Sequence, residues 1–294
     1  MGRIRVLRLV IWIAAAAFTA ALALAQASEP AVSITPATVV AGSPELIRVD
    51  EPATAELSGE WLGQQLEFFR SANGWDALAG VDVQAKPGPS TMTIHVRLAD
   101  GAERDLTRTV TIQPAHYRTA ELSVAPRFIE PNPEELKQIE FEIALKKKIF
   151  AESAPQRLWS GDFRAPVRAA PTDSFGTQRT FNGKLASVHK GMDFRAHMGT
   201  PVHASNSGVV VLAERLYFEG NCVVIDHGLG LYTIAMHLSK IDVHDSEHVT
   251  KGQLLGLSGA TGRVTGPHLH WAVRWGNAYL DPAKLLRMNL AGVR

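Results

Sequence analysis

Short apolar segments recur along the first part of the chain at intervals of roughly ten residues, a spacing typical of strands in small β-domains. They are rich in Val, Ile, Thr and Phe and lie at 46–49, 65–69, 92–98 and 106–112. Turn-forming pairs such as Asn73-Gly74 and Asp100-Gly101 separate them. The pattern predicts a small immunoglobulin-like β-sandwich over residues 31–115, in which no candidate chemistry is visible.

A helical pattern follows at 133–152, inside a linker that spans 116–160. Asn132 is suited to cap the helix, Pro133 to occupy its first position, and Glu135 to complete a capping box. Acidic residues open the segment and three lysines close it, which matches the helix dipole. The apolar stripe expected to pack inward consists of Leu136, Ile139, Ile143 and Phe150.

Residues 161–290 are again rich in β-structure. Apolar runs that predict strands lie at 209–212, 223–226, 231–236 and 268–273. The chain as a whole is therefore predicted to be mostly β. It should have a sandwich, one linking helix and a C-terminal antiparallel β-domain.

The first 27 residues resemble a leader for export. Arg3, Arg5 and Arg8 precede an apolar stretch, and Ala25 and Ala27 offer a site for cleavage after small residues. We expect a signal peptide at 1–27 and a mature protein in the periplasm. The alternative is an uncleaved membrane anchor, since the apolar stretch reaches the short limit for a span.

Charge and cysteine content narrow the possible partners. The 294 residues include 30 basic and 29 acidic side chains. Without the three leader arginines the balance is 27 against 29, a net charge of −2, which argues against a nucleic-acid partner. Cys222 is the single cysteine, so stability must come from packed cores without an internal disulfide.

Two separated segments carry the candidate chemistry. His189 and Asp193 stand on either side of Gly191, which argues for a loop or short strand rather than a helix. His268 and His270 lie on a predicted strand, which places both side chains on one face. A catalytic zinc site has three nitrogen or oxygen ligands and one position for water. His189, Asp193 and one histidine of the second pair would complete it and leave the other histidine beside the metal.

These segments, together with the run at 220–228 and the lead-in at 175–183, resemble the LytM/lysostaphin-type zinc metallopeptidases of Gram-negative type, over roughly 176–284. The resemblance implies that His189, Asp193 and His270 hold one zinc ion per chain. It implies that His237 and His268 are catalytic histidines that do not bind the metal. The implied fold is a compact antiparallel β-domain of the LytM peptidase type with an open groove.

The implied function is an exported zinc endopeptidase that hydrolyses peptide cross-links of peptidoglycan in cell-wall remodelling. Its partners would be peptidoglycan stem peptides, with D-alanyl to meso-diaminopimelate as the expected bond and a glycine-rich bridge as the alternative. A membrane is a partner only if the leader stays uncleaved. The alternative functions are a non-catalytic regulator of cell-wall amidases and a wall-binding adaptor.

Two further expectations concern the surroundings of the site. Some relatives have a tyrosine shortly before the first ligand, and none stands between Gly176 and His189. Arg179 is therefore a candidate for substrate or oxyanion contact, although a structural role is the stronger interpretation. Because all candidate residues lie after residue 188, the chain before residue 155 is expected to be dispensable for chemistry.

Overall fold

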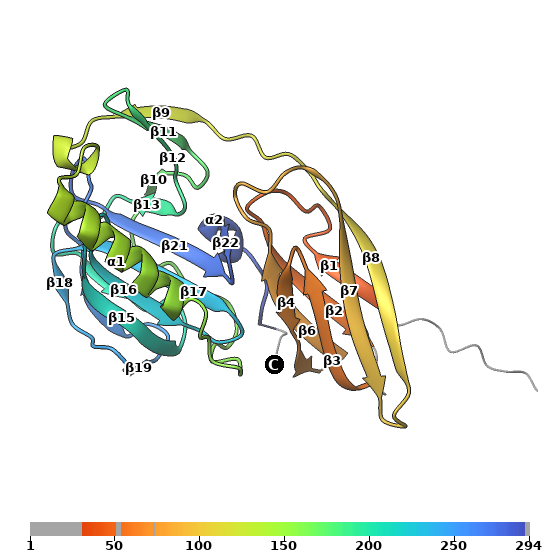
Figure 1. The fold of residues 1–294 in the computed structure, drawn as a ribbon. Helices are drawn as coiled ribbons and strands as arrows, with labels where there is room; N and C mark the ends of the chain where they lie inside the picture. Colours follow the sequence, from red (N-terminus) through yellow and green to blue (C-terminus); the bar gives the residue numbers. More distant parts are fainter. Residues whose placement is uncertain (1–30, 51–53, 73, 292–294) are drawn as a thin grey trace, which may run out of the picture.

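The computed structural model describes residues 31–50, 54–72 and 74–291 (Figure 1). Two β-rich parts lie side by side, and the linker between them runs across the top of the C-terminal part in this view. The predicted signal peptide at 1–27 lies outside the described residues. No helix among the described residues is long and apolar enough to cross a membrane.

The N-terminal part is built from two four-stranded antiparallel sheets. The first has the order β1-β2-β6-β5, with β1 (Ala31–Thr35), β2 (Pro44–Asp50), β6 (Gly74–Gly80) and β5 (Phe69–Ser71). The second has the order β4-β3-β7-β8, with β4 (Gln64–Glu67), β3 (Thr54–Trp61), β7 (Gly88–Leu98) and β8 (Glu103–Ile112). Side chains from both sheets, such as Ile47 and Ile94, are fully buried. The predicted runs at 46–49, 92–98 and 106–112 fall on β2, β7 and β8, whereas the run at 65–69 is divided between β4 and β5. The immunoglobulin-like topology stays a prediction.

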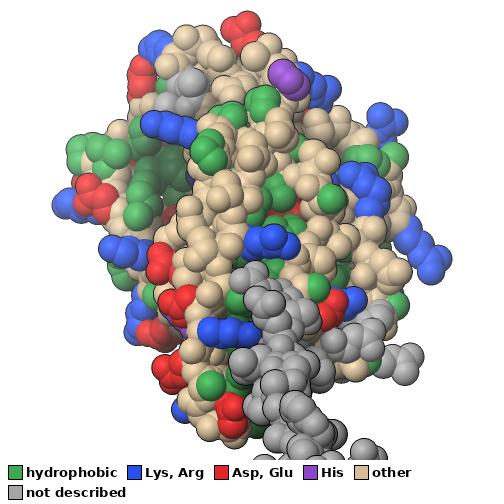
Figure 2. Space-filling model, turned by 90° about the vertical axis from the view of Figure 1, so that its right-hand side faces the viewer, with side chains coloured by type: hydrophobic (Ala, Val, Ile, Leu, Met, Phe, Trp, Pro, Cys, Tyr) green, Lys and Arg blue, Asp and Glu red, His purple; other side chains and the backbone are tan. Residues whose placement is uncertain are grey.

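The outer surface of the sandwich is of mixed charge. Figure 2 shows acidic and basic side chains scattered over this face. Such a surface gives no single-sign field toward a partner.

The linker forms β9 (Thr119–Leu122), a 3₁₀ turn η1 (Pro126–Phe128) and α1 (Pro133–Ile149). The capping box forms as expected, with both hydrogen bonds between Asn132 and Glu135 at 2.9 Å. The helix ends at Ile149, before the expected residue 152.

The inward face of α1 differs from the predicted stripe. Leu136 and Ile143 are exposed, and the one fully buried side chain of the helix is Glu142. Both carboxylate oxygens of Glu142 accept hydrogen bonds from the backbone N–H of Tyr217, at 2.9 and 3.0 Å. This polar contact fixes which side of the helix faces the sheet. Leu145, Ile149 and Phe150, rather than Leu136, cover the sheet.

The C-terminal part contains one large sheet with the order β10-β13-β21-β17-β16-β15-β19, and β22 added beside β21. Its strands are β10 (Pro171–Asp173), β13 (Met192–Phe194), β15 (Gly208–Leu216), β16 (Gly220–Asp226), β17 (Leu231–Leu238), β19 (His248–Val249), β21 (Leu269–Trp275) and β22 (Ala278–Leu280). Helix α1 covers one face of this sheet, where Cys222 is buried as its apolar surroundings predict.

Two three-stranded sheets complete this part. One has the order β14-β20-β18, with β14 (Pro201–His203), β20 (Leu254–Leu257) and β18 (Lys240–Ile241). The other has the order β12-β11-β9, with β11 (Gln178–Phe181) and β12 (Leu185–Val188). Because β9 pairs in parallel with β11, the linker contributes a strand to the C-terminal part. A short helix α2 (Pro282–Leu285) follows β22.

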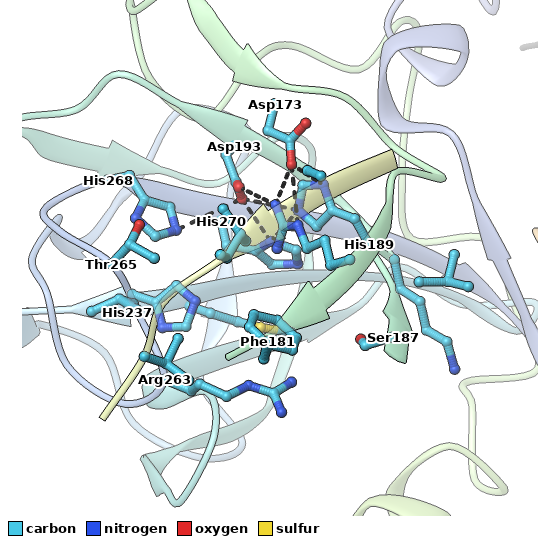
Figure 3. Close-up of a pocket in the computed structure, with 18 of the residues that line it drawn as sticks. Asp173, Phe181, Ser187, His189, Asp193, His237, Arg263, Thr265, His268 and His270 are labelled. Atoms are coloured by element: carbon cyan, nitrogen blue, oxygen red, sulfur yellow. Dashed lines mark hydrogen bonds and ion pairs between the residues drawn. The ribbon is translucent and has the colours of Figure 1, made fainter. Parts of the chain in front are cut away.

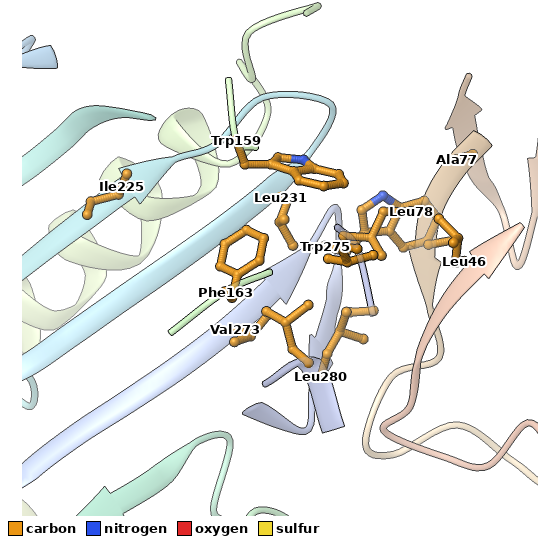
Figure 4. Close-up of a cluster of buried hydrophobic side chains, with 14 of the residues drawn as sticks. Leu46, Ala77, Leu78, Trp159, Phe163, Ile225, Leu231, Val273, Trp275 and Leu280 are labelled. Atoms are coloured by element: carbon orange, nitrogen blue, oxygen red, sulfur yellow. The ribbon is translucent and has the colours of Figure 1, made fainter. Parts of the chain in front are cut away.

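The two parts share one continuous apolar core. Figure 4 shows Leu78 of the sandwich beside Trp275 and Leu280 of the C-terminal part. A Cβ added at Gly80 would lie 2.3 Å from a methyl group of Leu280, so only glycine allows this approach. The Asp281 N–H also donates to the Gly42 carbonyl at 2.7 Å. Removal of the chain before residue 155 would take away this packing, together with β9 and α1. That this part is dispensable for chemistry stays a prediction.

Candidate metal centre and its groove

Strand register brings three candidate ligands together. In the antiparallel pair β13–β21, Asp193 stands directly opposite His270, and His189 follows the end of β12. The Asp193 Oδ1 lies 3.0 Å from His189 Nε2 and 2.8 Å from His270 Nδ1, and the two ring nitrogens are 2.9 Å apart. Gly191 is required here, because a Cβ would lie 2.5 Å from His270 Nε2.

Two members of the cluster, His189 and Asp193, are oriented by a contact behind them. His189 Nδ1 donates to the Ser174 carbonyl at 3.0 Å, so its lone pair is on Nε2 and faces the cluster. The second oxygen of Asp193 accepts a hydrogen bond from Arg179 at 2.6 Å. Such outer contacts fix ring orientation and donor direction in metal sites.

Protonation states also suit metal binding. Burial raises the pKa of the Asp193 carboxyl, but the hydrogen bonds and charges of His189 and His270 outweigh it and hold that pKa well below its usual range. Burial lowers the pKa of His270 to about 4, against the opposing effect of Asp193. Near neutral pH the cluster therefore offers a carboxylate and a neutral imidazole, the forms that bind a metal ion.

The donor set fits zinc. One ligand atom from each of His189, Asp193 and His270 lies within 4.8 Å of the others, and all three residues are buried. Two imidazole nitrogens and one carboxylate oxygen form a typical catalytic zinc set. The triangle edges of 2.8–3.0 Å are slightly shorter than the spacing of about 3.3 Å that follows from tetrahedral zinc bonds of about 2.0–2.1 Å. A small outward movement of the side chains would accommodate the ion.

Two more histidines face the same centre (Figure 3). His237 Nδ1 donates to the Thr261 carbonyl at 2.9 Å, and His268 Nδ1 donates to the Gly266 carbonyl at 2.8 Å. Each ring therefore keeps its lone pair on Nε2. Their ring centres are 5.0 Å apart, and His268 Nε2 lies 3.7 Å from Asp193 Oδ1.

His237 has an unusual backbone conformation and a buried side chain. Its φ of 64° is uncommon for a residue with a side chain, and such outliers cluster at functional sites. Burial, with the charges of His270 and His268, holds its pKa well below the usual range. His237 is thus a neutral base near pH 7.

Asp173 is a site residue that the sequence reasoning missed. Its carboxylate lies 3.4 Å from His189 Nδ1 and accepts hydrogen bonds from Arg118 and Arg179. Burial raises its pKa, but Arg179 and Arg118 outweigh it and lower that pKa to about 2. Arg179 therefore bridges Asp173 and Asp193, which supports the structural interpretation of this arginine.

The five candidate residues line a groove of about 1050 Å³. One wall comes from β9 and β11, and the other from the turn between β20 and β21. Five linker residues between Arg118 and Val124 line the groove, although the sequence had placed them in a connecting segment. Cationic side chains that also line the groove are Arg118, Arg179, Lys190, Arg195 and Arg263.

The comparisons with known proteins point to one family. The sequence model of Peptidase family M23 matches residues 187–282, which include all five candidate residues. The chain is 51% identical over 88 residues to "Peptidoglycan DD-endopeptidase ShyA" of Vibrio cholerae, a match that covers 30% of this chain and 20% of the relative. It is 39% identical over 98 residues to "DD-carboxypeptidase/endopeptidase Mpg" of Neisseria meningitidis, covering 33% and 23%. The chain thus spans about a fifth of the length of these curated relatives.

A solved structure resembles nearly the whole chain. It is a putative peptidase M23 from Pseudomonas aeruginosa, 30% identical, with a TM-score of 0.67. The match covers 86% of this chain and 95% of that chain. The similarity therefore extends over the sandwich and linker as well as the C-terminal part.

Asp173→Asn tests the contact behind the first ligand. The neutral amide should hold Arg179 and the His189 ring less firmly, so we expect zinc affinity to fall about 10–100-fold. Competition with a coloured chelator measures this. Asp105→Asn, on the exposed surface of the sandwich, should bind zinc as the unaltered protein does. Unchanged affinity in Asp173→Asn would contradict the positioning role.

Proposed function

This chain belongs to peptidase family M23, and on that basis we propose that it is a zinc-dependent endopeptidase of peptidoglycan. Its substrate would be the peptide cross-link between D-alanine and meso-diaminopimelate. The observation that carries the proposal is the cluster of His189, Asp193 and His270 on the floor of a groove, with His237 and His268 beside it. The names of the two curated relatives support the choice of substrate.

The chemistry divides between the cluster and the two other histidines. A zinc ion held by His189, Asp193 and His270 would supply polarisation of the scissile carbonyl and a water of lowered pKa. His237 and His268 each have a lone pair on Nε2, because their Nδ1 protons are engaged with backbone carbonyls. One of these nitrogens can accept the proton of the attacking water. Once protonated, it can donate a hydrogen bond to the oxyanion and then pass the proton to the leaving amine.

The geometry favours a catalyst over the rival readings. A non-catalytic regulator or a wall-binding adaptor needs no second pair of histidines facing the metal cluster. A structural zinc site is closed by four protein ligands, whereas three donors form this cluster among the described residues. The open groove is also suited to a peptide strand of a polymer rather than to an enclosed small molecule.

We propose in addition that the protein is exported to the periplasm, because its N-terminus has the arginine-rich and apolar pattern of a signal peptide. Cleavage should give a mature chain that begins near Gln26 or Ser28. Mass spectrometry of the protein recovered from the periplasmic fraction checks this. A chain that keeps Met1 and sediments with membranes would support the anchor instead.

Single alanine substitutions should divide the five site residues into two classes. His189→Ala, Asp193→Ala and His270→Ala each remove a ligand, so zinc content and turnover should both collapse. His237→Ala and His268→Ala keep all three ligands, so we expect near-stoichiometric zinc. The rate should fall roughly 10²–10⁴-fold, the contribution that a positioned proton-transfer group usually makes. Metal analysis beside turnover on purified sacculi measures both.

The control for this series is His244→Ala, because His244 is an exposed loop residue. It should leave zinc content and turnover unchanged. If His268→Ala lost zinc while His270→Ala kept it, the ligand assignment would be reversed. If neither lost zinc, β21 would not bind the metal and the proposal would fail.

A further inference from the structure

Arg263 is a groove residue that the proposed chemistry does not use. It lies in the turn between β20 and β21, below His237 in Figure 3. Its guanidinium carbon is 4.8 Å from the ring centre of Phe181 and 4.5 Å from that of Phe218. Two aromatic rings therefore hold the cation in place, one on β11 and one in the turn after β15.

This cation has no anionic partner among the described residues. Its guanidinium makes no hydrogen bond or ion pair there, whereas Arg179 pairs with two aspartates. Glu219 is a nearby acid whose Oε1 is paired with Lys146, and it forms no ion pair with Arg263. Burial lowers the pKa of Arg263, and Glu219 only partly opposes this effect. A partly desolvated cation that lacks a partner is poised to accept an anion from a ligand.

The turn that carries Arg263 is fixed relative to the catalytic histidines. The Thr261 carbonyl accepts a hydrogen bond from His237 Nδ1. The Thr261 hydroxyl accepts one from the Asn221 N–H at 2.9 Å. Gly262 has a φ of +77°, and a Cβ there would lie 2.4 Å from the backbone nitrogen of Gly220. This close packing holds the turn against the β15–β16 hairpin, so Arg263 and His237 share one rigid support.

The other cations of the groove are engaged or more exposed. Arg118 is paired with Asp173, and the Lys190 ammonium lies 5.0 Å from the ring centre of Tyr279. Arg195 is exposed to solvent. Arg263 is therefore the groove cation best suited to recognise a specific carboxylate next to the reacting bond.

We propose, on the basis of the endopeptidase function above, that Arg263 binds the free carboxylate of meso-diaminopimelate that stands next to the scissile amide nitrogen. Each end of this amino acid carries an amino group and a carboxyl group on the same carbon. When the cross-link acylates the amino group, the neighbouring carboxyl stays free and negatively charged. A planar guanidinium can accept it through two parallel hydrogen bonds. A glycine-rich bridge has no carboxylate at this place, so Arg263 would select the type of cross-link.

The test uses the full zinc-loaded protein and two synthetic cross-linked peptides. They are identical except that the carboxyl beside the scissile nitrogen is free in one and amidated in the other. The unaltered protein should cleave the free acid with a kcat/KM about 10–100-fold higher, as expected for one charged hydrogen-bonded contact. Arg263→Gln should lose most of this preference, mainly through a higher KM for the free acid. Arg263→Lys, which keeps the charge without the planar fork, should retain part of it.

Arg195→Gln is the matched control, because it removes the same charge from the same groove. It should keep the preference for the free acid. Equal cleavage of both peptides by the unaltered protein would overturn the inference. A preference for the free acid that survives in Arg263→Gln would also overturn it. An equal loss of kcat/KM on both peptides in Arg263→Gln would do the same, because it indicates a purely structural arginine.

Failure of the underlying function would look different. In that case the zinc-loaded unaltered protein would cleave neither peptide, and the inference would fall with the function. If Arg263→Gln does not fold, as judged by thermal unfolding, the ratio measured for Arg263→Lys decides. A ratio equal to that of the unaltered protein would then count against the proposal, and a reduced ratio would support it.

Discussion

The pairing of β13 with β21 is the contact on which the candidate site depends. Register places Asp193 opposite His270, and a shift by one residue would turn one of the two side chains to the other face of the sheet. Gly191 allows the His270 ring to pass the backbone just before β13. Arg179 then orients the carboxylate of Asp193, and Ser174 orients the His189 ring toward the pair.

The metal cluster could be anticipated because its members lie in short segments with local meaning. His189 and Asp193 are close in sequence, and the alternation along a strand sets His268 and His270 on one side. Asp173 could not be found in the same way. It reaches His189 only through the pairing of β10 with β13, and no local pattern around it signals a role.

The linker illustrates a second limit of sequence reasoning. The capping residues of α1 are local and were predicted correctly. The buried face was predicted only in part, because Leu136 and Ile143 are exposed whereas Phe150 packs against the sheet. Glu142 bonds to the backbone of Tyr217, which is distant in sequence, and this bond decides which side of the helix faces the sheet. The parallel pairing of β9 with β11 is likewise non-local, and it makes the linker a wall of the groove. The sandwich and the C-terminal part share one core, and the linker joins the C-terminal part through β9 and α1.

Zinc titration of the metal-free protein on purified sacculi tests the central claim most directly. After chelator treatment and removal of the chelator, turnover should be absent and should rise with added zinc to a break at one ion per chain. Release of cross-linked peptides as separate strands should follow the same curve. Full turnover without metal, or no turnover at one bound zinc per chain, would contradict the account.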